Sequence, residues 1–340
     1  MKIHELLQHL EAVAPPRYQE SYDNAGLIVG DAGRELTGVL LCLDSTEAVV
    51  AEAAELGCNL IVAHHPIVFR GLKRLTGSTY VERVVMEAIR RDIAIYAAHT
   101  NLDNVFHQGV NAKIGEKLGL LNTRILSAKA VLKQLSFTAP AEEWPELEGA
   151  LQEAGAEAVW QSAAGSGQQA TDKRLHGTTI FPEGVETAVR RILEQTSCAE
   201  IRGVHSLENK AATVGSGLIG QLREPLEEAD FLQQLKERMQ AGCVRHTALL
   251  GKPVQTVAVC GGAGGFLLPA AIAQGADVFV TADYKYHEFF DADGRIVIAD
   301  IGHYESEQYT IELLKEIISE KFRNFAVHCT KVSTNPVQYL

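Results

Sequence analysis

The chain alternates between short apolar runs and amphipathic stretches, with glycines or polar residues between them. Apolar runs of four to six residues predict buried strands, and apolar positions at helical spacing predict helices. In the first part of the chain the expected strands are 38–43, 59–63 and 93–98, and the expected helices are 2–14, 47–56, 80–91 and 110–118. Strand, helix and strand with short joins form a βαβ unit, so the pattern predicts an α/β fold with a parallel sheet.

The character of the chain changes near residue 130. Expected elements from there on are a strand at 132–138, a helix at 142–153, strands at 158–161 and 178–181, a helix at 185–196 and a strand at 200–204. Residues 164–173 are small and polar, which is typical of a loop or a disordered tip. The order β-α-β-β-α-β predicts a small ferredoxin-like α+β domain at 131–211, inserted into the core domain.

After the expected insert, the chain repeats its first part. At a constant shift of 218 residues, Val39 meets Val257, Cys42 meets Cys260, Gly57 meets Gly275 and His65 meets Asp283. At a shift of 204, His99 meets His303 and Asp103 meets Glu307. The repeat predicts a duplicated βαβ core with a mixed or parallel sheet, in which 1–130 and 212–340 are the two halves of one discontinuous domain.

The composition of the chain disfavours several classes of function. The 340 residues are 46% hydrophobic, enough for a large core. The net charge of −12 disfavours a nucleic-acid surface, which needs clustered Lys and Arg. No apolar run approaches the ~18–20 residues of a membrane span. The six scattered cysteines form no Cys-x-x-Cys pair, so we expect reduced thiols in a cytoplasmic protein.

Histidines stand at the ends of three expected strands. His64-His65-Pro66 follows one strand, His99 to Asp103 follows another, and Gly302 to Glu307 follows a third at 296–301. Neighbouring residues of an extended strand point to opposite sides, so His64 and His65 can reach two different metal ions. Three strand ends with histidines, two of which also carry an acid, predict one shared site.

A set of histidines with Asp and Glu, and without Cys, suits Zn²⁺, Mn²⁺, Fe²⁺, Co²⁺ or Ni²⁺, and carboxylates also admit Mg²⁺. Two such ions held ~3.5–4 Å apart by a bridging carboxylate activate water for hydrolysis. The candidate ligands are His64, His65, Asp103, His303 and Glu307, with Glu307 or Asp103 as the bridge. Each residue taken alone is more often structural, so the prediction rests on the three motifs together.

Other motifs are open to two interpretations. His99 corresponds to His303 in the repeat, so it is a ligand, an acid–base catalyst or a partner that orients Asp103, or else a buried structural histidine. His287 is a second acid–base candidate, and Lys285 either meets an anionic substrate or is an ordinary exposed lysine. The glycine-rich stretch 260–265 either approaches a ligand phosphate or packs a strand closely on a helix. Residues 23–26 line the same cleft or form only a turn.

Taken together, these motifs resemble one family, the GTP cyclohydrolase 1 type 2 homologues, also called NIF-three-like proteins. The resemblance covers about 1–125 and 212–340 and includes the closing 334–339. It implies two divalent metal ions per chain, held by His64, His65, Asp103, His303 and Glu307. It also implies a ring-shaped homohexamer and, in longer members, an inserted domain of the kind expected at 131–211.

Two functions follow from these observations. The first is a metal-dependent hydrolase that acts on a nucleotide or a related small molecule, because the expected ligands suit water activation. The alternative is a non-catalytic metal- or ligand-binding scaffold, or a regulatory protein that acts through its inserted domain, because the sequence has no clear base-recognition motif. Fold and ligands alone do not choose between the two.

Overall fold

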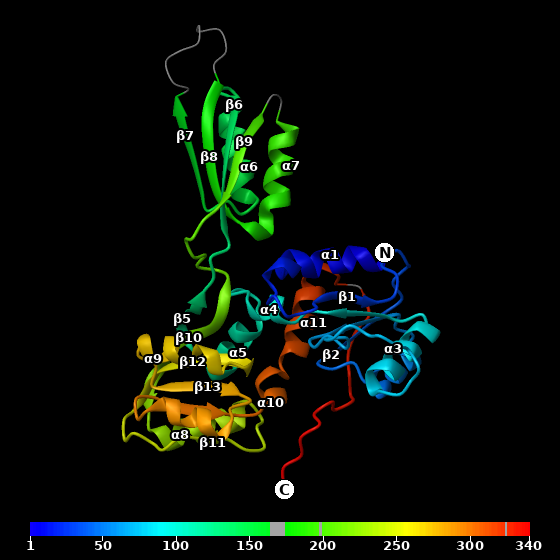
Figure 1. Cartoon of the computed structure of the whole chain (residues 1–340), viewed down its shortest axis with the longest axis vertical. Helices are drawn as coiled ribbons and strands as arrows, with labels where there is room; N and C mark the ends of the chain where they lie inside the picture. The colour runs from blue at the N-terminus through cyan, green and yellow to red at the C-terminus, as the bar shows by residue number, and fades with distance from the viewer. Residues whose placement is uncertain (164–173, 197–198, 324) are drawn as a thin grey trace. The chain divides into compact units, whose positions relative to one another are not determined.

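A computed structural model describes residues 1–163, 174–196, 199–323 and 325–340 of the chain (Figure 1). Two compact units divide these residues: unit 1 comprises Met1–Ser127 and Gly215–Leu340, and unit 2 comprises Ala128–Val214. The loop or disordered tip expected at 164–173 lies outside the described residues. In the described part of the chain, no helix is long and apolar enough to cross a membrane.

Unit 1 contains two sheets. The first has the strand order β1-β4-β3-β2-β15, and its β2, β3, β4 and β15 run parallel while β1 pairs antiparallel with β4. Its strands are β1 (Gly26–Val29), β2 (Val39–Cys42), β3 (Leu60–Ala63), β4 (Ala94–Ala97) and β15 (Val327–Cys329). The helices that pack on it are α1 (Ile3–Val13), α2 (Glu47–Glu55), α3 (Tyr80–Arg90) and α11 (Thr310–Lys321).

The first sheet is covered on both faces, which explains why its strands are apolar at every position. Val39 and Leu41 of β2 pack in the core with α1 and α11, whereas Leu40 and Cys42 pack in a second core with α2 and α3. Alternate residues of a strand point to opposite faces, so a sheet buried on both sides needs a continuous apolar run. The expected strands and helices of residues 2–98 thus form the predicted α/β fold. Thr46 caps α2, where its hydroxyl accepts from the Val49 amide.

The second sheet has the order β11-β14-β13-β12-β10-β5. Strands β12, β13 and β14 are parallel, and β10 and β11 flank them in antiparallel pairs. Its strands are β5 (Leu121–Ala128), β10 (Gly215–Leu226), β11 (Arg245–His246), β12 (Val254–Ala263), β13 (Val278–Ala282) and β14 (Val297–Asp300). Helices α5 (Val110–Leu118), α8 (Glu228–Arg238) and α11 share one core with strands of both sheets. After β12 follow the 3₁₀ turn η3 (Gly265–Leu267) and the short α9 (Leu268–Ala273).

The two sheets share a three-stranded pattern with matching register. Val39 pairs with Leu60 in the first sheet, and Val257 pairs with Val278 in the second, so both strands are shifted by the same 218 residues. Ala94 of β4 pairs with Leu60 and Val297 pairs with Val278, which is a shift of 203. Beyond these strands the second half contains one additional residue, Gly302 at φ 93°. The shift between His99 and His303 is therefore 204. The mixed α/β fold expected from the sequence is confirmed.

Unit 2 is built around a four-stranded antiparallel sheet of order β7-β8-β6-β9. The elements follow one another as β6 (Leu132–Pro140), α6 (Trp144–Glu153), β7 (Ala158–Ala163), β8 (Arg174–Pro182), α7 (Glu186–Gln195) and β9 (Glu200–Ser206). Phe137 and Trp144 stack in its core, with ring centroids 5.6 Å apart. The element order is the one expected from the sequence, and the assignment to a ferredoxin-like domain at 131–211 stays a prediction.

Candidate metal centre

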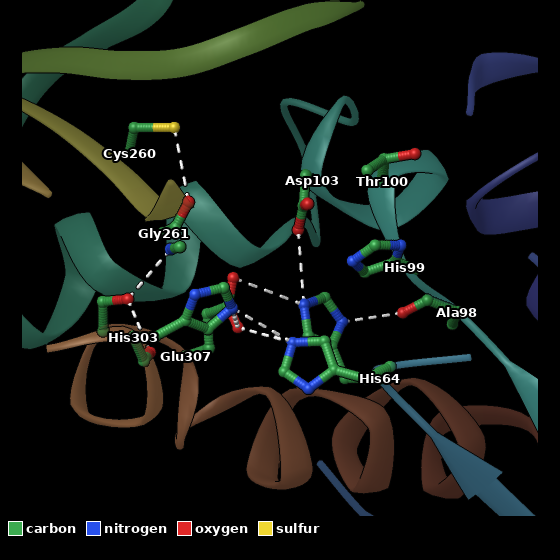
Figure 2. Close-up of polar contacts among 12 residues, drawn as sticks. His64, Ala98, His99, Thr100, Asp103, Cys260, Gly261, His303 and Glu307 are labelled. Atoms are coloured by element: carbon green, nitrogen blue, oxygen red, sulfur yellow. Dashed lines mark hydrogen bonds and ion pairs between the residues drawn. The ribbon is translucent and has the colours of Figure 1, made fainter. Parts of the chain in front are cut away.

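His64 and His65 extend β3 beyond its last residue. The His64 amide donates to Cys42 O at 3.1 Å and the His65 amide donates to Leu43 O at 2.9 Å, so the backbone continues in the direction of the sheet. The two side chains therefore leave the strand on different sides. His303 and Glu307 lie one turn apart on the short helix α10 (His303–Glu307), which places both on one helix face. Figure 2 shows His64, Asp103, His303 and Glu307 with their polar groups directed at one another.

The first group of candidate ligands surrounds His64. Its Nε2 atom lies 3.7 Å from Asp103 Oδ1 and 3.6 Å from Glu307 Oε1. Within the described part of the chain, His64 Nε2 and Asp103 Oδ1 are buried polar atoms without a hydrogen-bond partner. An unpaired buried polar atom is costly, and a cation between these atoms would remove that cost.

The second group surrounds His65. Its Nε2 atom lies 2.9 Å from Glu307 Oε2 and 3.3 Å from His303 Nε2, and His303 Nε2 lies 3.1 Å from the same Glu307 oxygen. Two imidazole nitrogens and a carboxylate oxygen that converge in this way suit a divalent transition-metal ion. Ligand atoms of His64, His65 and Glu307 also lie within 4.8 Å of one another, so these residues could hold a metal ion.

Glu307 connects the two groups. Its Oε1 faces His64, and its Oε2 faces His65 and His303. The side chain is only 3% exposed. A carboxylate that presents one oxygen to each of two ligand groups has the geometry of a bridging ligand.

Each histidine at the site donates its Nδ1–H to an oxygen, which leaves Nε2 free to face the candidate ion. The four acceptors are Ala98 O for His64 at 2.8 Å, Asp44 Oδ1 for His65 at 2.8 Å, Asp283 Oδ2 for His303 at 2.7 Å and Asp23 Oδ1 for His99 at 2.7 Å. These bonds fix the ring orientations and raise the basicity of the free nitrogens.

In the metal-free chain, burial and neighbouring groups shift the pKa values of several candidate ligands. Burial opposes protonation of His65, but hydrogen bonds with Asp44 and Glu307 outweigh it and raise its pKa to about 9. The pKa of His303 is raised in the same way, against burial, by Asp283 and Glu307. Burial and the neighbouring Glu307 charge raise the pKa of Asp103. Protons on His65 and His303 are therefore favoured where a cation would bind, whereas burial lowers the pKa of His64.

His99 lies beside the five candidate ligands. Its ring centroid is 5.4 Å from that of His64 and 5.5 Å from that of His65. Asp23 accepts from His99 and also from the backbone amide and the hydroxyl of Thr100. Burial opposes ionisation of Asp23, but these bonds dominate and hold its pKa at about 2, so it stays a carboxylate. Residue 23 thus belongs to the site and not only to a turn.

Two residues considered in the sequence lie elsewhere. His287 is exposed on η4 (Tyr286–Ala292), where its ring contacts Tyr286 at 5.1 Å between centroids, and it does not line the cavity at the candidate metal centre. The acid–base role considered for His287 has no support from this position. Lys285 is exposed and pairs with Glu288 at 3.2 Å, as an ordinary surface lysine does.

The glycine-rich stretch packs against the candidate ligands. A Cβ on Gly262 would lie 2.5 Å from Glu307 Oε1 and 3.2 Å from His303 Cε1, and a Cβ on Gly264 would lie 2.5 Å from Thr281 Oγ1. Of the two interpretations, close packing therefore accounts for these glycines. They allow β12 to approach α10 and leave space for the Glu307 carboxylate.

Asp44 and Asp283 were not recognised as site residues from the sequence. Asp44 stands two residues beyond the end of β2, and Asp283 occupies the position that corresponds to His65 in the repeat, at φ 60°. An acid within two residues of the end of a parallel strand was the available signal, since the carboxyl ends of such strands meet at one edge. Asp44 also accepts from Thr334 Oγ1 at 2.7 Å, so the C-terminal segment contacts the partner of His65.

Comparisons with known proteins agree with the motifs. The family model described as Duf34/NIF3 (NGG1p interacting factor 3) matches residues 1–336. A Staphylococcus epidermidis protein named GTP cyclohydrolase 1 type 2 homolog is 32% identical over 370 aligned residues, with 100% of both chains covered. The crystal structure of a Bacillus cereus protein related to NIF3 is 31% identical, with a TM-score of 0.84 and coverage of 100% of this chain and 99% of that one. A Staphylococcus aureus crystal structure is 29% identical, with a TM-score of 0.80 and the same coverage.

Proposed function

This chain belongs to the Duf34/NIF3 family, and from that premise we propose that it is a hydrolase that uses two divalent metal ions and acts on a nucleotide or a related small molecule. The proposed ligands are His64, His65, Asp103, His303 and Glu307. The ions would be Zn²⁺, Fe²⁺, Mn²⁺, Co²⁺, Ni²⁺ or Mg²⁺, since the donors are imidazole and carboxylate.

The observation that carries the proposal is the position of Glu307 between the two ligand groups. Its two oxygens face different histidines, at 3.6 Å from His64 Nε2 and 2.9 Å from His65 Nε2. A single ion beside His65 and His303 would leave His64 Nε2 and Asp103 Oδ1 buried without a partner. A pair of ions satisfies both groups, and it is the arrangement that water activation between two metals requires.

When bound, the two ions would lower the pKa of water and stabilise the negative charge that develops on the reacting oxygen. The chain's own residues would fix the orientation of the ligand side chains. Asp44, Asp283 and the Ala98 carbonyl hold three imidazoles with Nε2 directed inward. His99, which hydrogen-bonds to Asp23 at 2.7 Å, would accept or deliver a proton beside the ligands.

The test is metal analysis of the purified full chain, followed by a panel of nucleotides, cyclic amides and phosphoesters. We expect turnover that is lost on chelation and restored by one metal in particular. Glu307→Gln should abolish turnover, while His287→Ala, on an exposed histidine outside the cavity, should retain it. Binding of two metals without turnover of any compound, together with ligand binding by residues 128–214, would favour the alternative, a regulatory scaffold.

The proposed assembly is a homohexamer. Its support is the family relationship and a separate unit 2, which can pair with its copies without altering the core. Multi-angle light scattering of the full chain should give about six times the mass of one chain, 37.0 kDa. A monomer or dimer at micromolar concentration contradicts this assembly and leaves the metal proposal unaffected.

A further inference from the structure

We infer that the substrate of the candidate metal centre is a planar, uncharged nitrogen heterocycle, recognised by stacking on aromatic side chains and not by a polyphosphate group. This inference rests on the proposed hydrolase function and narrows its substrate class. The cavity above the candidate ligands has a volume of 560 Å³. That volume lies within the range of about 300–1,000 Å³ that is usual for small-molecule sites.

Aromatic side chains line part of the cavity wall. Tyr22 and Phe69 have ring centroids 6.2 Å apart, and Phe69 meets the His99 ring edge-on at 6.3 Å. These contacts make a continuous aromatic surface that ends at the candidate metal centre. Phe266 lines the same cavity from η3, after the glycine-rich stretch.

These rings are unusually accessible for large apolar side chains. Tyr22, Phe69 and Phe266 are 63%, 48% and 67% exposed. Burial of an aromatic ring is strongly favourable, so rings left open at the walls of a cavity indicate a partner with an apolar face. Aromatic side chains take planar rings by stacking, which contributes about 1–3 kcal/mol for each base in nucleic-acid complexes.

The charges of the lining disfavour a polyphosphate. Among the described residues that line the cavity, none is a lysine or an arginine. The titratable acids that line it are Glu20, Asp44, Asp103, Glu305 and Glu307. Sites that bind several phosphates offset the charge with Arg, Lys or metal ions. The two proposed ions would bring four positive charges against the five carboxylates of this lining, so no net positive charge remains for a polyphosphate.

The glycine-rich stretch does not supply a phosphate cradle either. The amide of Gly261 donates to Asn111 Oδ1 at 3.0 Å, that of Gly262 to Ser306 Oγ at 2.9 Å and that of Gly264 to Thr281 Oγ1 at 3.0 Å. A phosphate-binding loop needs such amides free to face the ligand. Here they hold the loop against α5, α10 and β13, and the cavity keeps an apolar, aromatic character.

The experiment measures binding to the full, metal-loaded chain by isothermal titration calorimetry. The probes are the uncharged adenosine, guanosine and pterin, with GTP as the charged counterpart of guanosine. We expect at least one uncharged probe to bind, and GTP to bind no more than about threefold tighter than guanosine. Phe69→Ala and Phe266→Ala should each weaken binding of the uncharged probe by about 5- to 150-fold. This range corresponds to the loss of one stacked base.

Matched variants separate stacking from general damage. Phe69→Tyr keeps the ring and should bind within threefold of the original chain. Phe290→Ala removes an equally exposed ring, 68% accessible, that does not line the cavity, and it should leave binding unchanged. Metal content is measured for every variant, since the inference requires it to stay constant.

Four results would overturn the inference. They are tenfold or tighter binding of GTP over guanosine, unchanged binding in both alanine variants, no binding of any uncharged probe at millimolar concentration, and a Phe266→Ala effect confined to the oligomeric state. Failure of the hydrolase proposal has a different signature, because turnover would be absent while stacked probes still bind and Phe69→Ala still weakens them.

Discussion

His65 and Glu307 are separated by 242 residues, yet His65 Nε2 lies 2.9 Å from Glu307 Oε2. The contact joins the end of β3 in one sheet of unit 1 to α10, which follows β14 of the other sheet. The second Glu307 oxygen faces His64 at 3.6 Å. One carboxylate thus lies between neighbouring histidines of the same strand, and the following predictions depend on that relationship.

Metal content should respond differently to loss of the bridge and loss of a terminal ligand. His64→Ala and His65→Ala should each retain about one ion per chain, because each removes a ligand from one group only. Glu307→Ala should approach none, because it removes a ligand from both groups. Elemental analysis of dialysed protein measures the ratio, with His287→Ala as a control that keeps both ions. If Glu307→Ala retains two ions, Asp103 becomes the candidate bridge.

His99 should act as an acid–base group oriented by Asp23, and not as a metal ligand. We expect Asp23→Asn and His99→Ala to keep both metals while turnover or metal affinity falls ~10–100-fold, the usual effect of removing a partner that orients a site. Asp23 is held ionised with a pKa of about 2, so Asn removes a charge that His99 faces. Loss of one ion from His99→Ala would instead identify His99 as a ligand.

Metal affinity should increase with pH. In the metal-free chain the pKa of His65 is raised to about 9 and that of His303 is also raised, so an ion must displace a proton from each at neutral pH. We therefore expect proton release on binding, and an apparent affinity that rises roughly 10- to 100-fold per pH unit from pH 6 to 8. Titrations in buffers of different ionisation enthalpy measure the protons. An affinity that is independent of pH would contradict this account.

The stability of the metal-free chain should decrease as the pH rises, in contrast to the metal affinity. The contribution from a raised His65 pKa is complete below its ordinary value of 6.5 and is lost as the pH rises through about 9. The thermal midpoint of the metal-free chain should fall over that interval through this contribution. His65→Gln, without a titratable ring, removes the contribution, and its midpoint should vary less over the same interval.

Gly262→Ala should disturb the metal centre as well as the backbone. Gly262 has φ 61°, and an added Cβ would lie 2.5 Å from Glu307 Oε1. Gly275→Ala is the matched control, because Gly275 has φ 72° and no atom within 4 Å of an added Cβ. Both should lose about 1–2 kcal/mol of unfolding free energy from the left-handed conformation. Only Gly262→Ala should also lose metal, and equal metal content in the two variants would contradict the packing argument.

Deletion of unit 2 should leave a folded core that binds metal. The Lys129 amide donates to Val214 O at 2.9 Å, so the two ends of this unit lie side by side where it leaves the core. Strands β5 and β10, which precede and follow it, are neighbours in the second sheet. A short Gly-Ser linker from Ser127 to Gly215 should therefore close a hairpin. Circular dichroism and metal analysis test the variant, and loss of metal on deletion would contradict a separate unit.

The local pattern was sufficient for strands β2, β3 and β4, the helices between them and the candidate ligands, but it gave no expectation for β10, α8 or α11. Strand β2 must be apolar on both faces because helices cover both, and that requirement is visible as a continuous run from Val39 to Leu43. The His-x-x-x-acid spacing of His303 and Glu307 follows from one helical turn, and the repeat indicated the same relationship for His99 and Asp103. These properties depend on residues close together along the chain, so the sequence by itself determined them.

The tertiary structure decided the relationships between remote segments. The choice of Glu307 over Asp103 as the carboxylate between the two groups depends on where α10 lies relative to β3, and no spacing in the sequence contains that distance. The same holds for Asp44 and Asp283, which are recognised as partners of His65 and His303 only once their strands are adjacent. His287 has as favourable a sequence position as His99, but η4 leaves it exposed and outside the cavity. A periodic pattern encodes which face of an element is buried, whereas the convergence of side chains depends on how separate elements pack.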